Sequence, residues 1–491
     1  MFKAILRLTK QSVIYGVGHV LTKAVIIILL PIHTNFLSPD EFGITTIVML
    51  FLGIMSIIYS FGLNTAFLQF YMLENDKKAG NRYFSTALIA TAITAVVLST
   101  VLFVSKNVIS KILFDSQNYG YLIKLSIGIL FFDALILLSK NILRAEERSI
   151  IYAVFSLINV TFNCLFNIIF VAYRLMGVEG IFLAYFLSSG ITFILFLPIV
   201  IKHFLPFFSL EMFKRMLIFG FPFIPATLAI FLIDTIDRAF IKHYLGLDAT
   251  GIYGAGYRVA LVIKLFINAF QIAWVPFFLS LANDENAKKI FSKILTYFIL
   301  ICSLIFLIFT MYMDQIIRLN IFGYTIIGRE FWGSTQIVPA VILAYIFYGI
   351  YLNFLVGVYY KEKTKFLIVI TGIGAIVNIF GNIFLIPTFK LLGAAYATVL
   401  SYCSMAVLLF FINQQFYPIQ YEFRKILKIC LLSAIIFFTF QYISLPYELI
   451  TRAILIFIYL VLLYISGFFE SKEIQTIRLF FKGIYGKVST R

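Results

Sequence analysis

A short sequence pattern occurs twice in this chain. Residues 37–44 read LSPDEFGI and residues 245–252 read LGLDATGI, and in both places an Asp and a Gly-Ile pair lead into a long apolar stretch. Three more pairs follow in the same order along the chain: Asn163 and Asn167 with Asn378 and Asn382, residues 180–184 with 393–397, and residues 144–147 with 360–363. Four matches in one order, at offsets of 208 to 216 residues, indicate an internal repeat.

The composition around these patterns is that of a membrane protein. Of the 491 residues, 62% are hydrophobic and 12% are charged, and the mean hydropathy is +1.01. A soluble domain carries about twice that share of charge, whereas about 20 consecutive apolar residues cross a bilayer as a helix. Such stretches fill the chain. The short segments of alternating apolar and polar residues that are typical of an outer-membrane barrel do not occur. The sequence predicts an all-α polytopic membrane protein.

Hydropathy predicts fourteen transmembrane helices joined by short connections. They are expected at residues 12–34, 43–71, 83–105, 120–140, 150–172, 178–200, 216–240, 252–280, 291–313, 335–359, 366–387, 391–412, 426–443 and 450–468. Six spans separate the two copies of the repeat, and since six is even, both copies enter the membrane with the same orientation. We therefore expect parallel six-helix bundles at residues 1–205 and 206–415, with two further helices and a basic tail at 416–491.

The basic residues fix the predicted orientation. The termini and the loops after even-numbered spans carry 26 Lys and Arg residues, whereas the opposite loops carry 8. Under the positive-inside rule, this difference predicts cytoplasmic N- and C-termini. It also accounts for most of the net charge of +17, so a nucleic-acid partner is not expected. The first apolar stretch is of spanning length and lacks a signal-peptide pattern, so we expect it to stay in the membrane.

Motifs for common enzyme and metal sites are absent from the sequence. It contains no phosphate-binding loop, no H-E-x-x-H and no C-x-x-C. The four Cys residues lie far apart in apolar segments, which predicts core positions, and the four His residues are equally scattered, so no metal site is expected. We expect no enzymatic activity and no cofactor. Energy for transport would come from an ion gradient, of H⁺ or Na⁺, or from consumption of the product.

Several segments together resemble a known family. They are Pro31, residues 37–43, Gly220-Phe221-Pro222, Asp237-Arg238, residues 251–254 and the two Asn pairs. Over the whole chain they are similar to the polysaccharide-exporter branch of the multidrug/oligosaccharidyl-lipid/polysaccharide flippase superfamily. The resemblance implies a bacterial inner-membrane flippase, and the parallel repeat predicts that it works by alternating access. It would move undecaprenyl-pyrophosphate-linked oligosaccharide units outward for O-antigen or capsule synthesis. Its partners would be this substrate, membrane lipids, and a glycan polymerase or chain-length regulator.

Ionisable residues inside predicted spans are costly, so they are the first candidates for a functional site. The sequence places Lys23 in the first span, Lys124 and Asp133 in the fourth, Asp234, Asp237 and Arg238 in the seventh, and Arg258 and Lys264 in the eighth. Asp234 and Arg238 are spaced i, i+4, which predicts a salt bridge along one helix face. Asp237 and Asp133 lack such a partner, so they are the candidates for coupling to an ion gradient.

Three of the cations have no acidic residue three or four positions away in their own helix: Lys23, Arg258 and Lys264. An unpaired cation in an apolar environment needs a compensating charge. We expect these residues to bind the pyrophosphate or an acidic sugar, unless a carboxylate from another helix pairs with them. The resemblance supports Lys23, because it follows Thr22 where lipid II flippases carry a basic residue. Asn64 and Gln271 are candidates for hydrogen bonds to sugar, and the Asn pairs for hydrogen bonds between helices.

Two alternative functions remain open on the sequence alone. A cation-coupled multidrug exporter of the same fold would need a more acidic cavity than five basic and three acidic intramembrane residues provide. A membrane glycan polymerase or acyltransferase would need a large polar loop or a cluster of His, Asp and Glu, and neither is visible. The flippase is therefore the favoured prediction.

Overall fold

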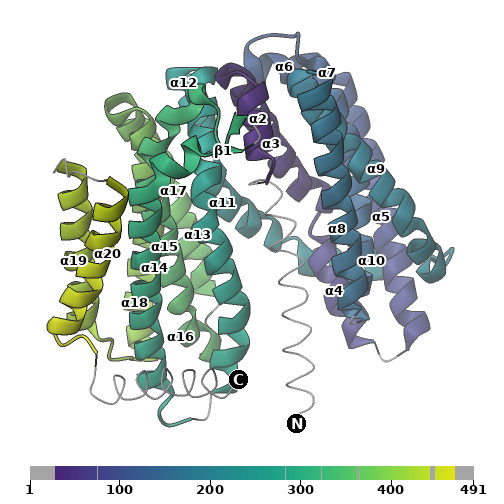
Figure 1. The fold of residues 1–491 in the computed structure, drawn as a ribbon. Coiled ribbons are helices and arrows are strands. Elements are labelled where there is room, and N and C mark those ends of the chain that lie inside the picture. Colours follow the sequence, from purple (N-terminus) through teal and green to yellow (C-terminus); the bar gives the residue numbers. More distant parts are fainter. Residues whose placement is uncertain are drawn as a thin grey trace, which may run out of the picture.

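The computed structural model describes residues 28–469, except 75, 147, 282–283, 322, 362, 364 and 443–447. Lys23, most of the predicted first span and the basic tail lie outside these residues. The described part is built almost entirely of helices, arranged in two lobes that stand side by side (Figure 1). An all-α polytopic fold is thereby confirmed.

The first lobe contains the helices up to residue 203. They are α2 (Leu30–Phe36), α3 (Pro39–Ser60), α4 (Leu63–Leu73), α5 (Lys77–Val104), α6 (Lys106–Phe114), α7 (Gly120–Ala145), α8 (Ser149–Asn167), the π-helical turn η1 (Ile168–Tyr173) and α9 (Gly177–His203). A capping box starts α3: the Ser38 hydroxyl accepts from the Glu41 backbone, and the Glu41 carboxylate accepts from the Ser38 backbone.

The remaining helices follow from residue 210. They are α10 (Leu210–Gly220), α11 (Phe223–Thr235), α12 (Asp237–Leu245), α13 (Leu247–Ser280), α14 (Ala287–Arg318), the 3₁₀ helix η2 (Arg329–Ile337), α15 (Val338–Asn353), α16 (Leu355–Tyr360), α17 (Lys365–Phe389), α18 (Leu391–Phe416), α19 (Phe423–Tyr442) and α20 (Glu448–Ile465). Strands β1 (Asn320–Ile321) and β2 (Tyr324–Thr325) form an antiparallel hairpin. Every predicted span from the second onward coincides with one or more of these helices.

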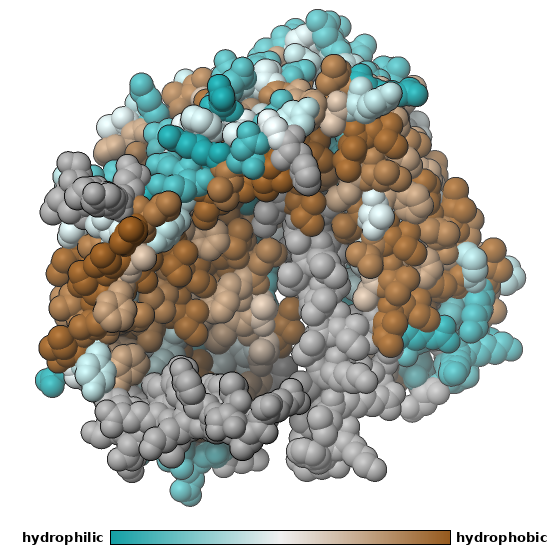
Figure 2. Space-filling view, viewed as in Figure 1, coloured by the Kyte–Doolittle hydropathy of each residue, from teal (hydrophilic) through white to brown (hydrophobic). Residues whose placement is uncertain are grey.

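Ten described helices are long and apolar enough to cross a membrane. The count becomes eleven when α10 and α11, which are bent by 42° relative to each other, are taken as one span. Fourteen spans therefore stays a prediction. Figure 2 shows a broad band of hydrophobic side chains across the middle of the visible face and hydrophilic side chains gathered at its top, as expected for a protein that spans a bilayer.

The repeated pattern at residues 37–44 and 245–252 lies where α3 of the first lobe crosses α13 of the second. A Cβ atom on Gly43 of α3 would lie 2.1 Å from the Leu247 carbonyl oxygen, and one on Gly251 of α13 would lie 1.9 Å from the Pro39 carbonyl oxygen. The two contacts are reciprocal, since Gly43 corresponds to Gly251 and Pro39 to Leu247, both at an offset of 208 residues. Only glycine permits so close a crossing of two helices. The two copies of this pattern, residues 37–44 and 245–252, therefore form matching contact surfaces between the lobes.

Further contacts join the lobes at the same end, near the top of Figure 1. The Asn35 side chain donates to the Thr325 carbonyl (2.6 Å), and the Gly328 backbone donates to the Thr34 hydroxyl (3.1 Å). Lys242 of α12 also forms an ion pair with Asp115, which follows α6 of the first lobe, with Nζ and Oδ2 2.5 Å apart. The hydrogen bond and charge of Lys242 lower the pKa of Asp115. Toward the opposite end the ribbons of the two lobes diverge.

Helix α10 packs on the first lobe, although it follows the predicted boundary at residue 205. Its Met216 is buried with Leu63 and Phe67 of α4. Gly220 and Gly62 touch backbone to backbone, because a Cβ on Gly62 would lie 2.3 Å from the Gly220 carbonyl oxygen. Since α11 packs on α17, the seventh predicted span passes from one lobe to the other at its bend.

Candidate functional site

A cavity of about 390 Å³ lies between the two lobes. Both lobes contribute to its wall, as the parallel repeat predicts. The lining residues are Leu29 and His33; Thr46, Met49 and Leu50 of α3; Tyr185 of α9; Phe231, Asp234 and Thr235 of α11; Arg238 of α12; Gly254, Tyr257, Arg258, Leu261 and Lys264 of α13; and Tyr345 of α15. Four of these side chains are charged, and three of the four are cations.

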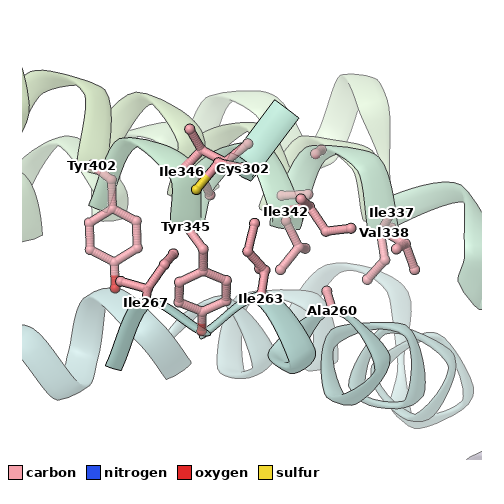
Figure 3. Close-up of a cluster of buried hydrophobic side chains, with 14 of the residues drawn as sticks. Ala260, Ile263, Ile267, Cys302, Ile337, Val338, Ile342, Tyr345, Ile346 and Tyr402 are labelled. Carbon is pink, nitrogen blue, oxygen red and sulfur yellow. The ribbon is translucent and has the colours of Figure 1, made fainter. Parts of the chain in front are cut away.

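Asp234 and Lys264 form an ion pair between α11 and α13. The Lys264 Nζ lies 2.5 Å from Asp234 Oδ2, and each side chain is less than one-fifth exposed. The Tyr402 and Tyr345 hydroxyls donate to the other carboxylate oxygen, at 2.5 and 3.3 Å. Figure 3 shows these two tyrosines among the apolar side chains of the core, with both hydroxyls directed to the same side. Lys264 therefore has a counterion, supplied by a neighbouring helix.

Asp237 and Arg238 form a second ion pair, at 2.9 Å. Asp237 is fully buried, and its second oxygen accepts a hydrogen bond from Tyr253 at 2.5 Å. The Arg238 guanidinium lies 4.2 Å above the Tyr257 ring and also contacts the backbone carbonyl of Asp234. The predicted salt bridge between Asp234 and Arg238 is thus replaced by two other pairs. Side chains from neighbouring helices contact the Asp234 carboxylate, whereas the i, i+4 neighbour Arg238 contacts the backbone carbonyl of Asp234.

Arg258 is arranged differently from the other three charged residues of the cavity. Its guanidinium lies 4.4 Å above the Phe42 ring, and its Nη1 is 3.3 Å from the His33 Nδ1. Within the described ranges, no carboxylate lies within ion-pair distance of Arg258. The absence of an acidic neighbour, predicted for Arg258 from its own helix, therefore extends to the described helices around it.

His33 links Arg258 to a buried polar chain in the first lobe. Its Nε2 lies 2.8 Å from the Asn167 side-chain oxygen, and Asn167 donates in turn to Asn163. Asn163 donates to the Ser188 hydroxyl on α9, which confirms a hydrogen bond between helices for this pair. Sequence reasoning missed His33 because only charged residues were counted within the span at 12–34. An imidazole inside a predicted span was the available signal.

The other predicted site residues lie away from the cavity wall. Asp133 is exposed on α7, where it accepts from the Ser189 hydroxyl at 2.7 Å. Asn64 on α4 accepts from Asn141 through its backbone carbonyl, at 3.2 Å. Gln271 is on α13, beyond Lys264, and is not among the lining residues.

The two-lobed helical fold is shared with membrane transporters and flippases of known structure. The chain belongs to the polysaccharide biosynthesis protein family, whose profile matches residues 8–282. The resemblance found in the sequence is thereby confirmed.

Individual relatives are distant. Protein 1 of the Lsg locus of Haemophilus influenzae is 23% identical over 292 residues, which is 56% of this chain and 66% of that protein, just under two thirds of its length. The lipid II flippase MurJ in an inward closed conformation shares 16% identity with a TM-score of 0.74, covering 92% of this chain and 98% of MurJ. An inward-facing multidrug resistance transporter of the MATE family shares 16% identity with a TM-score of 0.65, covering 80% and 94%. These two structures share the fold.

Proposed function

We propose that this protein is a flippase for lipid-linked oligosaccharides and that its substrate carries undecaprenyl pyrophosphate. Membership in a polysaccharide biosynthesis family and the transporter fold support the class. One observation carries the substrate chemistry: Arg258 projects into the cavity between the lobes without a carboxylate partner among the described residues.

The charges of the cavity favour an anionic ligand. Asp234 offsets Lys264, and Asp237 offsets Arg238, so the positive charge of Arg258 remains. An isolated cation in a low-dielectric site is costly, and a phosphate group would compensate it. Arginine also matches phosphate oxygens in a bidentate geometry. Lys264 is a second residue that would bind the phosphate, by leaving Asp234 for it, and Lys23 is a third.

Two features support alternating access of this cavity. The lobes are joined at the end of α12 and β1 and diverge at the opposite end (Figure 1). Under the predicted topology, the joined end is extracytoplasmic, so this conformation would take up substrate from the cytoplasm. Rocking of the lobes around the cavity would then carry the headgroup outward across a bacterial inner membrane.

The partners of Asp234 argue against a multidrug exporter. A cationic drug needs an available carboxylate, but the Asp234 carboxylate is held by Lys264, Tyr345 and Tyr402. For ion coupling, Asp133 is the stronger candidate of the two predicted acids. The Ser189 hydroxyl is its hydrogen-bond partner and no described cation lies within ion-pair distance, whereas Asp237 is bound by Arg238 and Tyr253.

A reconstituted transport assay tests the proposal. Proteoliposomes would receive a fluorescent undecaprenyl-pyrophosphate-linked sugar, and its arrival in the other leaflet would be measured. A charge-assisted hydrogen bond to phosphate contributes about 1.5–3 kcal/mol, so Arg258→Gln should weaken binding about 10- to 150-fold. Arg258→Lys should keep part of the activity, because the charge survives.

Arg174→Gln is the matched control, because Arg174 is an exposed arginine outside the cavity. It should flip substrate at the unmodified rate. Full flipping by Arg258→Gln, or transport of cationic drugs in place of the lipid-linked sugar, would contradict the proposal.

A further inference from the structure

The contacts of His33 define its protonation state. Arg258 can only donate, so the His33 Nδ1 that lies 3.3 Å from its Nη1 must be an acceptor. The proton of the neutral ring is then on Nε2, which donates to the Asn167 oxygen at 2.8 Å. That oxygen is free to accept, because the Asn167 amide nitrogen donates to Asn163. In this arrangement, His33 is a neutral imidazole that supplies Arg258 with an acceptor.

No anion faces the His33 ring in the described part of its surroundings. Arg258 of α13 is the charged group in contact, Tyr185 of α9 lines the same cavity, and α3 presents the Phe42 ring edge to face at 6.4 Å between centroids. Among neighbouring segments, Tyr324 of β2 packs on Phe36, and the charged residues of η2, Arg329 and Glu330, are exposed. The His33 side chain itself is 2% exposed.

An anion would change this arrangement. A protonated His33 would place a second cation against Arg258 and would remove the acceptor that Arg258 uses, so protonation is unfavourable in this arrangement. A phosphate oxygen between the two side chains would accept from both, and it would offset both charges. Binding of the anion and of the proton would then each favour the other.

We propose that His33 and Arg258 form one phosphate-binding site in which His33 takes up a proton from solution as the phosphate group enters. The inference rests on the proposed function and adds a residue and a proton to its substrate site. Loss of the proton returns the Arg258 hydrogen bond to His33 and weakens the site, which favours release. Affinity for the anion therefore increases as the pH falls.

Calorimetry with inorganic pyrophosphate tests this on the full-length protein in detergent. Titrations in two buffers of different ionisation enthalpy, between pH 6 and 8, give the protons taken up per pyrophosphate. The unmodified protein should take up as much as one proton more than His33→Gln, whose amide cannot titrate. For each pH unit that the pH is lowered, its affinity for pyrophosphate should increase by as much as about tenfold more than that of the variant. The protonation of pyrophosphate itself cancels in this difference.

Two controls accompany the variant. His203→Gln should keep the proton uptake of the unmodified protein, since His203 is a buried histidine held by Glu146 away from the cavity. Should His33→Gln fold poorly, nitrogen-15 resonances of the four histidines in the unmodified protein give the same answer. One imidazole should shift to its protonated form on addition of pyrophosphate, and His33→Asn should remove that signal.

The outcomes separate the two proposals. If His33→Gln takes up as many protons as the unmodified protein, or if no imidazole responds to pyrophosphate, the role of His33 is wrong. The phosphate site at Arg258 would still stand, provided that Arg258→Gln loses pyrophosphate binding. If pyrophosphate does not bind, or binds equally well to Arg258→Gln, both the inference and the proposed function are wrong.

Discussion

At the residue scale, the charges of the cavity are sorted by their partners. Asp234 serves Lys264, Asp237 serves Arg238, and Arg258 rests against a neutral histidine and a phenyl ring. A paired charge contributes to the fold, because removing one member leaves the other uncompensated. A cation without a carboxylate is directly available to a ligand, whereas Lys264 would bind one only by giving up Asp234. The two classes should therefore respond differently to substitution.

The Asp234–Lys264 pair should behave as a structural unit. Asp234→Asn leaves Lys264 without its carboxylate and should cost about 3–5 kcal/mol of stability, as for other buried ion pairs that lose one partner. The double variant Asp234→Asn/Lys264→Gln should recover much of this loss. Thermal unfolding in detergent measures both, with Arg258→Gln as the comparison that should stay near the unmodified value. A double variant as unstable as the single one would show that the pair is not coupled.

Asp133 and Asp237 should separate in a test of ion coupling. Asp133→Asn removes a carboxylate with a single hydroxyl partner and should abolish the response of flipping to an imposed pH or sodium gradient. Asp237→Asn removes the counterion of Arg238 and should mainly lower stability. Rates in proteoliposomes under each gradient, together with unfolding temperatures, distinguish the two. Unchanged rates for Asp133→Asn under every gradient would exclude it as the coupling acid.

At the scale of helices, the crossing of α3 and α13 depends on two glycines. Backbone atoms lie where a side chain would begin at Gly43 and Gly251, so any other residue forces the helices apart. Exposed ion pairs contribute little, and Asp115 is 82% exposed, so the close packing matters more than its bond to Lys242.

Gly43→Ala and Gly251→Ala should each open the joined end of the molecule. Overpacking of this kind costs about 1–3 kcal/mol, enough to shift a balance between two conformations. Spin labels at positions 115 and 242, in a background without native cysteines, would report a longer or broader distance. Gly372→Ala is the matched control, since a Cβ there meets nothing within 4 Å. An unchanged distance in both glycine variants would refute this account of the crossing.

At the scale of the whole molecule, one predicted span, formed by α10 and α11, contacts both lobes, and the lobes share a cavity. Helix α10 packs on the first lobe while α11 packs on the second, so motion between lobes must pass through the bend at Phe221 and Pro222. The contacts at the ends of α2 and α12 hold one side of the cavity shut. A rocking mechanism requires those contacts to break in every cycle.

A disulfide across the joined end should therefore stop transport. The variant Asp115→Cys/Lys242→Cys places two thiols where the ion pair now bridges the lobes. Oxidation should abolish flipping and a reducing agent should restore it, while each single-cysteine variant should be indifferent to both treatments. Flipping at the full rate by the oxidised double variant would mean that the lobes do not rock apart at this end.

The sequence by itself determined the features that depend on local composition and order. Apolar length predicted a helix at every described span from the second onward, although not the short helix α6, and the repeat predicted two lobes with a cavity between them. These features follow from hydropathy and from chain order, which need no knowledge of contacts. It also marked Arg258, Lys264, Asp234 and Asp237 as costly residues within a membrane.

Only the tertiary structure decided which charges meet. The i, i+4 rule favoured Asp234 with Arg238, but α13, α15 and α18 bring Lys264, Tyr345 and Tyr402 to that carboxylate. His33 reaches Arg258 across 225 positions of the chain. Low dielectric makes each such contact strong, and helix packing alone brings the partners within reach. For that reason the site's charge balance, which carries the proposed function, could not be predicted from spacing along the chain.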